Sequence, residues 1–162
     1  MGKNEKLNFN IINMTKDHIS AVAAIESDVF SVPWSEQAFA DTLSMENVIF
    51  HIASFNDRVA GYCGIYLAAD EGEITNVAVA APYRRQGAAW MLLQETIARA
   101  HAKGAERIFL EVRSQNEPAI QLYEKTGFHT ISIRKHYYTD PDDDALVMMY
   151  DSADKYCNRL DK

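Results

Sequence analysis

Cysteine is scarce in this sequence, and long apolar runs are absent from it. The two cysteines, Cys63 and Cys157, lie far apart without the spacing of a metal or redox motif, which predicts a buried thiol and an exposed tail thiol. No apolar run approaches the roughly 20 residues of a membrane-spanning helix. Residues 1–8 are polar where a secretory signal needs an apolar centre. We therefore expect a cytoplasmic protein without a metal site or a membrane segment.

Lysine and arginine are also scarce relative to the acidic residues. The 16 lysines and arginines are outnumbered by 23 aspartates and glutamates, which gives a net charge of -7. Contacts with nucleic-acid phosphates need a basic surface, so this composition argues against direct nucleic-acid binding. An acidic surface can instead attract a basic substrate, and it also serves solubility alone.

The apolar content is sufficient for one globular domain. Of the 162 residues, 48% are hydrophobic, which is ordinary for a chain that buries a core. The pattern predicts strands near residues 9–13, 48–54, 59–68, 73–80, 107–112, 128–137 and 145–150, and helices over 15–28, 35–43, 89–103 and 117–125. This order predicts an α/β fold around a mixed sheet. We expect a single domain over 1–162 with its core at 9–150, and a tail at 151–162 that is either helical or frayed.

Local signals mark the ends of several helices. Thr15, Ser35 and Asn116 are predicted N-caps, and Gly104 and Gly127 are predicted C-terminal stops. The apolar side of the first helix is predicted to comprise Ile19, Val22, Ala23, Val29 and Phe30.

A loop rich in arginine and small residues follows the strand at 73–80. Its sequence is Arg84-Arg85-Gln86-Gly87-Ala88-Ala89, and it leads directly into a helix. A helix N-terminus presents unpaired N–H groups and a partial positive charge, and small residues let phosphate oxygens approach the backbone. The loop is neither a Walker A motif nor a three-glycine Rossmann motif. The alternative is a basic loop whose glycine serves a turn.

The loop and the preceding Asn76-Val77-Ala78-Val79 resemble the acetyl-CoA signature of the GNAT acetyltransferase superfamily. That signature is Gln or Arg, two residues of any type, Gly, one residue of any type, then Gly or Ala. The resemblance implies the GNAT fold, with a mostly antiparallel sheet of about seven strands and helices on both faces, and acetyl-CoA as cosubstrate. It implies that the strand backbone pairs with the pantetheine arm and that an amide near Val79 polarises the thioester carbonyl. The implied acetyl-CoA contacts are Val77, Ala78, Val79, Arg84, Arg85, Gln86, Gly87, Ala88, Ala89, Trp90 and Asn116.

Glu111 and Tyr123 are the candidates for proton transfer. Glu111 ends an apolar strand, where a carboxylate is costly unless it has a partner or a catalytic task. Glu73 is its rival as general base, because relatives of this fold place an acid on that strand. Tyr123, protonated at neutral pH, can lie on the same helix face as Asn116 and donate a proton to the departing thiolate. The structural alternatives are core packing for Tyr123 and, for Glu111, solvent exposure or a salt bridge to Arg113 or Arg134.

Four stretches in order resemble the RimI family within this superfamily, bacterial enzymes that acetylate the N-terminal alanine of a small-subunit ribosomal protein. They are Pro33-Trp34-Ser35, Asn76 to Val79, Leu110 to Asn116, and Arg134-Lys135-His136-Tyr137-Tyr138, and the likeness covers nearly all of 9–150. The resemblance implies Glu111 as proton acceptor and Tyr123 as proton donor. By this resemblance, the residues that line the peptide slot would be Pro33, Trp34, Tyr137 and Tyr138. The alternatives are a helix break with a packed indole, and a strand end with one tyrosine ring in and one out.

An acidic loop lies beside these tyrosines, at Asp140, Asp142, Asp143 and Asp144. It either attracts a basic peptide or consists of solvated turn residues, and His136 is expected to be structural.

We therefore expect an N-alpha-acetyltransferase that uses direct attack of the amine on the thioester of acetyl-CoA. The substrate would be the N-terminal peptide of a ribosomal protein, and the enzyme a monomer or weak dimer. Two alternatives stay open: a GNAT acetyltransferase of a small amine or a lysine side chain, and a non-catalytic acyl-CoA-binding module.

Overall fold

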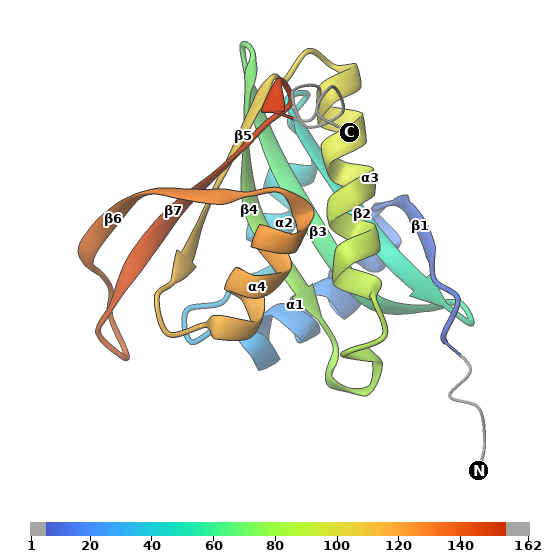
Figure 1. Cartoon of the computed structure of the whole chain (residues 1–162). Helices are drawn as coiled ribbons and strands as arrows, with labels where there is room; N and C mark the ends of the chain where they lie inside the picture. The colour runs from blue at the N-terminus through green and yellow to red at the C-terminus, as the bar shows by residue number, and fades with distance from the viewer. Residues whose placement is uncertain (1–5, 155–162) are drawn as a thin grey trace. The chain divides into compact units, whose positions relative to one another are not determined.

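The computed structural model describes residues 6–154, and says nothing of residues 1–5 and 155–162. The elements in chain order are β1 (Asn10–Asn13), the 3-10 helix η1 (Lys16–His18), α1 (Ile19–Val29), α2 (Glu36–Leu43), β2 (Val48–Phe55), β3 (Arg58–Ala68), β4 (Glu71–Val79), the 3-10 helix η2 (Ala81–Tyr83), α3 (Ala88–Ala102), β5 (Arg107–Arg113), α4 (Glu117–Thr126), β6 (His129–Tyr138) and β7 (Asp143–Asp151) (Figure 1). The strands of the described residues form one sheet in the order β1-β2-β3-β4-β5-β7-β6. The predicted α/β fold with a mixed sheet is confirmed.

The chain divides into two compact units. Unit 1 comprises residues 1–64 and 76–96, and unit 2 comprises residues 65–75 and 97–162. Strands β3 and β4 and helix α3 each begin in one unit and end in the other. The single domain expected from the sequence stays a prediction.

The core of unit 1 is built on helix α1 and strands β2 and β3. Val22 and Ile25 of α1 are buried, as helical spacing predicts, and they pack in a cluster with Phe39, Ile52 and Tyr62. The prediction that Val29 and Phe30 belong to the apolar side of this helix is wrong, because each is 38% exposed. Helix α1 ends at Val29, and extended backbone at Phe30 carries the chain away from the core face.

Caps and turns account for where the elements of unit 1 begin and end. Ser35 caps α2 as predicted, its hydroxyl oxygen accepting the N–H of Ala38 at 3.1 Å. Thr15 precedes a 3-10 turn rather than α-helix, and its N–H donates to the His18 ring at 3.0 Å. In unit 2, strand β4 begins at Glu71, two residues earlier than predicted, because the turn before it falls at residues 69–70.

The sheet of unit 2 contains both parallel and antiparallel pairings. Strands β4 and β5 pair in parallel, with Glu71 opposite Arg107 and Glu73 opposite Phe109. Strand β7 pairs antiparallel with β5 and, on its other side, with β6, which confirms the predicted β6–β7 hairpin. Side chains alternate along β5, so every second residue is buried while the others lie on a more open face. Glu111 is on that open face.

Helix α4 in unit 2 has both predicted ends. Asn116 caps it, with the side-chain oxygen accepting the N–H of Ala119 at 3.4 Å. Gly127 ends it with φ 117°, a left-handed conformation that suits glycine.

Two further predictions concern cysteine and the tail. Cys63 is buried as predicted, and burial raises the pKa of its thiol to about 12, so it is unsuited to act as a nucleophile. Cys157 and most of the tail lie outside the described residues. Between residues 6 and 154 the structure has no helix of the length and apolarity that crossing a bilayer requires.

Candidate active site

A cavity of about 280 Å³ opens on the sheet of unit 2. Its walls include Glu71, Glu73, Phe109, Glu111 and Arg134. Glu73 pairs in register with Phe109, and Glu111 is two residues further along β5, so the two acids point to the same face of the sheet. The structure therefore brings both candidate bases to one cavity.

The Glu111 carboxylate has an ion-pair partner at the cavity. Its Oε1 lies 3.3 Å from Nε of Arg134, and the Tyr137 phenol lies close enough for this carboxylate to raise its pKa. Among the structural alternatives for Glu111, the salt bridge to Arg134 is therefore present. The alternative partner, Arg113, instead donates to the carbonyls of Pro141 and Thr139 at 2.8 and 3.3 Å. Glu111 keeps a side-chain exposure of 20%, so its carboxylate is ordered and still accessible.

Tyr137 and Tyr138 lie at the end of β6 next to this carboxylate. Their ring centroids are 5.1 Å apart, edge to face, and each ring carries a guanidinium, Arg134 over Tyr137 and Arg113 over Tyr138. The nearby Glu111 carboxylate raises the pKa of Tyr137, and burial raises the pKa of Tyr138 to about 12. Tyr137 is 48% exposed and Tyr138 is half-buried, which agrees with one ring out and one in. Both stay protonated at neutral pH and can donate hydrogen bonds.

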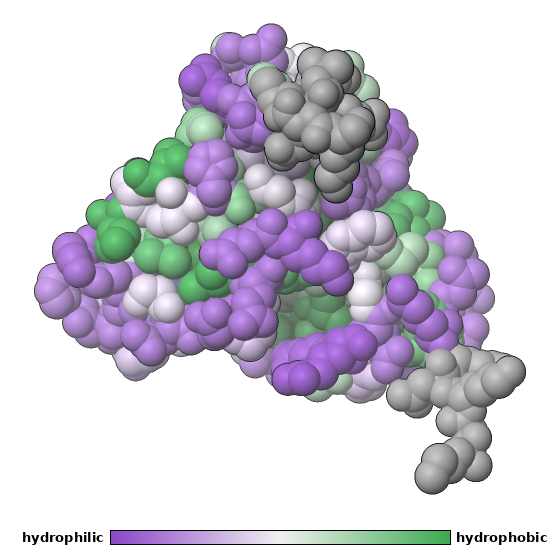
Figure 2. All heavy atoms as spheres, in the orientation of Figure 1, coloured by the Kyte–Doolittle hydropathy of each residue, from purple (hydrophilic) through white to green (hydrophobic). Residues whose placement is uncertain are grey.

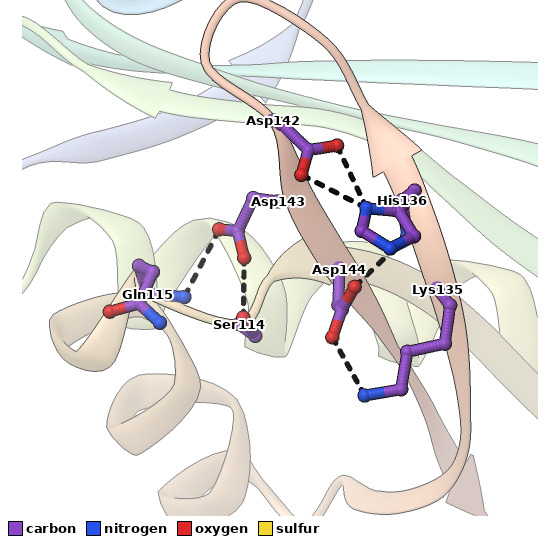
Figure 3. Close-up of polar contacts among 7 residues, drawn as sticks. All are labelled: Ser114, Gln115, Lys135, His136, Asp142, Asp143 and Asp144. Atoms are coloured by element: carbon purple, nitrogen blue, oxygen red, sulfur yellow. Dashed lines mark hydrogen bonds and ion pairs between the residues drawn. The ribbon is translucent and has the colours of Figure 1, made fainter.

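Three of the four aspartates in the acidic loop have hydrogen-bond or ion-pair partners. Asp142 pairs with the His136 ring at 2.9 Å, Asp143 accepts from Ser114 and from the Gln115 N–H, and Asp144 accepts from Lys135 at 3.0 Å (Figure 3). His136 is therefore a structural residue, as predicted. Of the two readings of this loop, attraction of a basic peptide loses support, because these charges already have local partners. In Figure 2, hydrophilic residues gather at the outer end of the β6–β7 hairpin.

Tyr123 lies on the buried face of helix α4. It is 7% exposed, and its ring meets that of Phe128 at a centroid distance of 6.0 Å. The structural alternative, core packing of this aromatic side chain, is therefore confirmed for the ring. Asn116 is exposed at the other end of the same helix, where its side chain caps the first turn. The proton-donor role of the Tyr123 hydroxyl stays a prediction.

The loop in unit 1 has the backbone of an anion site. Arg85 and Gly87 have φ of 59° and 89°, and the first helical hydrogen bond runs from Met91 N–H to the Gly87 carbonyl at 3.1 Å. Helix geometry then leaves the N–H groups of Ala88, Ala89 and Trp90 without partners inside the helix. Such N–H groups, at the positive end of a helix of 15 residues, favour a phosphate.

Side chains around this loop fit the same ligand. A Cβ added at Gly87 would lie 3.6 Å from Cε and 4.0 Å from Nζ of Lys6, so a basic side chain borders an otherwise open space above the glycine. Lys6 was not predicted, because it lies far away in the sequence in a polar segment without a motif. Arg84 donates through Nε to the carbonyl of Val79 at 3.0 Å, so part of its role is to close the loop onto the end of β4. The residues present fit a pyrophosphate group.

The predicted slot residues of unit 1 have unequal roles. The Trp34 ring packs on Phe39 and Phe50, with centroid distances of 5.3 and 6.4 Å, which confirms the reading as a packed indole. Pro33 is exposed beside it, and Val32 is 75% exposed. The accessible surface of this segment therefore comes mainly from Val32 and Pro33.

A buried carboxylate under this segment was not predicted. Glu26 is 2% exposed and accepts hydrogen bonds from the Trp34 N–H at 3.1 Å, from Asn76 Nδ2 at 3.3 Å and from the Tyr62 hydroxyl. Burial and this hydrogen bond raise the pKa of Tyr62. Glu26 thus connects the segment before α2 to strands β3 and β4. A signal existed in the sequence, because Glu26 follows Val22 by four residues and so lies on the apolar face of α1.

The chain is similar to known acetyltransferases over most of its length. Residues 19–128 match the Acetyltransferase (GNAT) family. A Bacillus subtilis (strain 168) protein with the provisional name ribosomal protein bS18-alanine N-acetyltransferase is 39% identical over 138 residues, which cover 84% of this chain and 91% of that protein. The ribosomal protein bS18-alanine N-acetyltransferase of Escherichia coli (strain K12) is 34% identical over 140 residues, covering 85% and 94%.

A solved structure gives the same result. The crystal structure of the ribosomal-protein-S18-alanine N-acetyltransferase from Escherichia coli matches with a TM-score of 0.82 and 32% identity, over 89% of this chain and 94% of that chain. The predicted fold and the predicted enzyme class, an N-acetyltransferase, are therefore confirmed. This chain belongs to the acetyltransferase (GNAT) family.

Proposed function

We propose that this protein transfers the acetyl group of acetyl-CoA to the α-amino group of an N-terminal alanine, with a bS18-type ribosomal protein as substrate. The observation that carries the proposal is the Glu111 carboxylate, ordered by Arg134 in an open cavity. It occurs in a chain that resembles bS18-alanine N-acetyltransferases over more than four fifths of its length. The proposal includes action as one catalytic domain in the cytoplasm, as a monomer or weak dimer.

Acetyl-CoA would be bound by the loop and helix start of unit 1. The N–H groups at the start of α3, with Gly87, Arg85 and Lys6, suit its pyrophosphate, and the backbone of residues 77–79 suits its pantetheine arm. Asn116 is the proposed contact from unit 2. When bound, acetyl-CoA supplies an acetyl thioester. The chain's own residues supply binding, orientation and proton transfer.

Glu111 is the proposed general base. An α-amine has an ordinary pKa of about 7.7 to 8.0, so part of it is already neutral at physiological pH. A carboxylate then suffices as the base that takes the proton which the nitrogen loses on forming the amide. As the nitrogen forms the amide bond, the proton passes to Glu111 directly or through water. Tyr123 is the proposed donor of a proton to the CoA sulfur as the thioester bond breaks. Neither step needs a metal ion or an enzyme nucleophile.

Each unit has exposed side chains that we propose for peptide binding, apolar ones in unit 1 and a phenolic one in unit 2. Pro33 and its neighbour Val32 are exposed in unit 1, and Tyr137 is exposed at the Glu111 carboxylate in unit 2. Protonated tyrosine hydroxyls can donate to peptide carbonyls, and apolar groups suit a small first residue such as alanine. These features support a peptide rather than a highly charged polyamine.

A substrate comparison tests the proposal. Purified protein with acetyl-CoA is given an alanine-starting bS18 peptide, the same peptide with a blocked α-amine and an internal lysine, or a polyamine. Release of CoA thiol and mass spectrometry of the peptide are measured, with Glu111→Gln as the matched control. We expect acetylation at the free alanine amine, abolished by the block. Faster reaction of the lysine or the polyamine would contradict the proposal.

The non-catalytic alternative is tested by separating binding from turnover. Calorimetric titration with acetyl-CoA measures binding, and the appearance of free CoA thiol in the presence of peptide measures reaction. Tight binding without thiol release for any amine would favour an acyl-CoA-binding module. Mass spectrometry of ribosomal proteins from cells with and without the gene then identifies the natural substrate.

A further inference from the structure

Strand β6 contains a bulge next to the cavity of unit 2. Arg134 pairs with Ala145, and Tyr138 pairs with Asp143, so Lys135, His136 and Tyr137 lie opposite the single residue Asp144. His136 has φ 52°, in the left-handed region that a residue with a side chain rarely adopts. Extra residues in a bulge are left out of the regular strand ladder, so other contacts must hold them.

Asp144 supplies contacts on the inner side of this bulge. Its Oδ1 accepts the backbone N–H of His136 at 2.9 Å, and its Oδ2 pairs with Nζ of Lys135 at 3.0 Å (Figure 3). These contacts, together with Lys135, lower the pKa of the Asp144 carboxyl, so it is ionised at neutral pH. The Asp144 carboxylate thus contacts two of the three bulged residues, Lys135 and His136. The third bulged residue is Tyr137.

The neighbouring aspartates connect the bulge to the end of β5. Asp142 holds the His136 ring, and Asp143 accepts from the Ser114 hydroxyl and, at 3.2 Å, from the Gln115 N–H (Figure 3). The Ser114 N–H in turn donates to the Asp144 carbonyl at 2.9 Å. Glu111 is three residues before Ser114, so the strand that carries the candidate base is connected to the bulge that carries Tyr137.

We propose that Asp144 is a positioning residue for acetyl transfer, which fixes the β6 bulge and thereby holds the Tyr137 ring against the Arg134 guanidinium that pairs with the Glu111 carboxylate. The inference rests on the proposed function for the role of Glu111 as base. Contacts that remain around Tyr137 are stacking contacts with Arg134 and Tyr138, at 5.4 and 5.1 Å. Stacking constrains a ring but does not fix the backbone conformation of a bulge, whereas the bond to the His136 N–H does.

Three variants test this role. Asp144→Ala removes both contacts of the carboxylate, while Asp144→Asn keeps an oxygen for the His136 N–H and loses the ion pair with Lys135. Asp140→Asn is the matched control, because it removes one negative charge from the same loop outside the bulge contacts. For Asp144→Ala we expect kcat/KM for the alanine peptide to fall on the order of tenfold, the scale of a misplaced catalytic group. The KM for acetyl-CoA should not change, Asp144→Asn should retain most activity, and Asp140→Asn should match the wild type.

A second readout follows Tyr137 without any assay of activity. The pKa of its phenol is raised by the nearby Glu111 carboxylate, and ultraviolet difference titration of each protein against its Tyr137→Phe version isolates this group. In Asp144→Ala we expect the pKa of Tyr137 to fall toward its ordinary value. A merely stabilising role would lower the melting temperature and leave this titration unchanged.

The two proposals fail in different ways. If the wild type acetylates the peptide and Asp144→Ala changes neither the peptide kinetics nor the Tyr137 titration, the inference is overturned and the proposed function stands. If the wild type acetylates no peptide, the proposed function is overturned, and the Tyr137 titration still decides whether Asp144 holds the bulge.

Discussion

The guanidinium of Arg134 lies against the carboxylate of Glu111, with Nε and Oε1 3.3 Å apart. The two residues come from β6 and β5, which do not pair with each other, since β7 lies between them. Arg134 is 56% exposed, so this ion pair contributes little to the free energy of folding. Its consequence is orientation, because it holds the carboxylate in the wall of the cavity.

Glu111→Gln is expected to lower kcat by about 100-fold or more, because general base catalysis contributes on this scale. Its affinity for acetyl-CoA should stay the same, since the residue is not a proposed cofactor contact. Glu73→Gln is the matched variant, an acid of the same cavity. Steady-state kinetics with the alanine peptide compare the two. A larger loss in Glu73→Gln would transfer the base role to the rival residue.

Tyr123→Phe is expected to slow acetyl transfer roughly tenfold to 100-fold, the scale of a lost general acid. The ring packing on Phe128 would be retained, and the melting temperature, measured alongside, separates a loss of stability from a loss of turnover. Tyr137→Phe is a useful comparison, because it removes a hydroxyl near the proposed base, Glu111, and leaves the proposed acid in place. Single-turnover rates of CoA release measure the effect. An unchanged rate would remove Tyr123 from the mechanism.

Gly87→Ala is expected to weaken acetyl-CoA binding. A side chain at φ 89° costs about 1 to 2 kcal/mol, and its Cβ would stand where phosphate oxygens approach the loop. Gly104→Ala is the matched control, with φ 99° and nothing within 4 Å of the added Cβ. Both variants should lose similar stability in thermal unfolding. Calorimetry with acetyl-CoA should show weaker binding for Gly87→Ala alone, and equal affinities would argue against a cofactor role for this loop.

Glu26→Ala is expected to destabilise the protein by roughly 2 to 4 kcal/mol, because it leaves buried donors without an acceptor. Those donors are the Trp34 N–H, the Tyr62 hydroxyl and Asn76 Nδ2. Urea unfolding measures the loss, and Glu46→Ala, at an exposed position, serves as control. A loss no greater than that of the control would show that these donors find other partners.

The pH dependence of the contacts around the β6 bulge follows from pKa shifts in opposite directions, upward for His136 and downward for Asp143 and Asp144. Its hydrogen bond to Asp142 raises the pKa of His136, so that contribution to stability is full below the ordinary histidine value and is lost as pH rises through the raised pKa. Hydrogen bonds lower the pKa of Asp143 and Asp144, so their contribution is lost as pH falls through the lowered values. NMR titration of the His136 ring should give a pKa above 6.5 that decreases in Asp142→Asn. An identical value in both proteins would mean that the pair does not form in solution.

Local sequence was sufficient to predict the elements and several of their ends. Ser35, Asn116 and Gly127 act through hydrogen bonds or backbone angles within a few residues, so their roles could be predicted without knowing the fold. That Glu111 lies on the more open face of β5 came from the structure, because the sequence left a salt bridge and solvent exposure as alternatives. The two residues wrongly assigned to the apolar side of α1, Val29 and Phe30, are its last residue and the one after it, where helical spacing no longer determines which side chains face the core.

The sequence by itself determined the α/β order and indicated a candidate anion loop and a candidate acid and base, since each depends on residue type and short spacing. Only the tertiary structure decided which partners these groups have. Arg134 and Tyr137 reach Glu111, and Lys6 reaches Gly87, through strand order, a bulge and chain segments far apart in sequence. Local spacing carries no information on such approaches, because they depend on how non-neighbouring segments pack and pair.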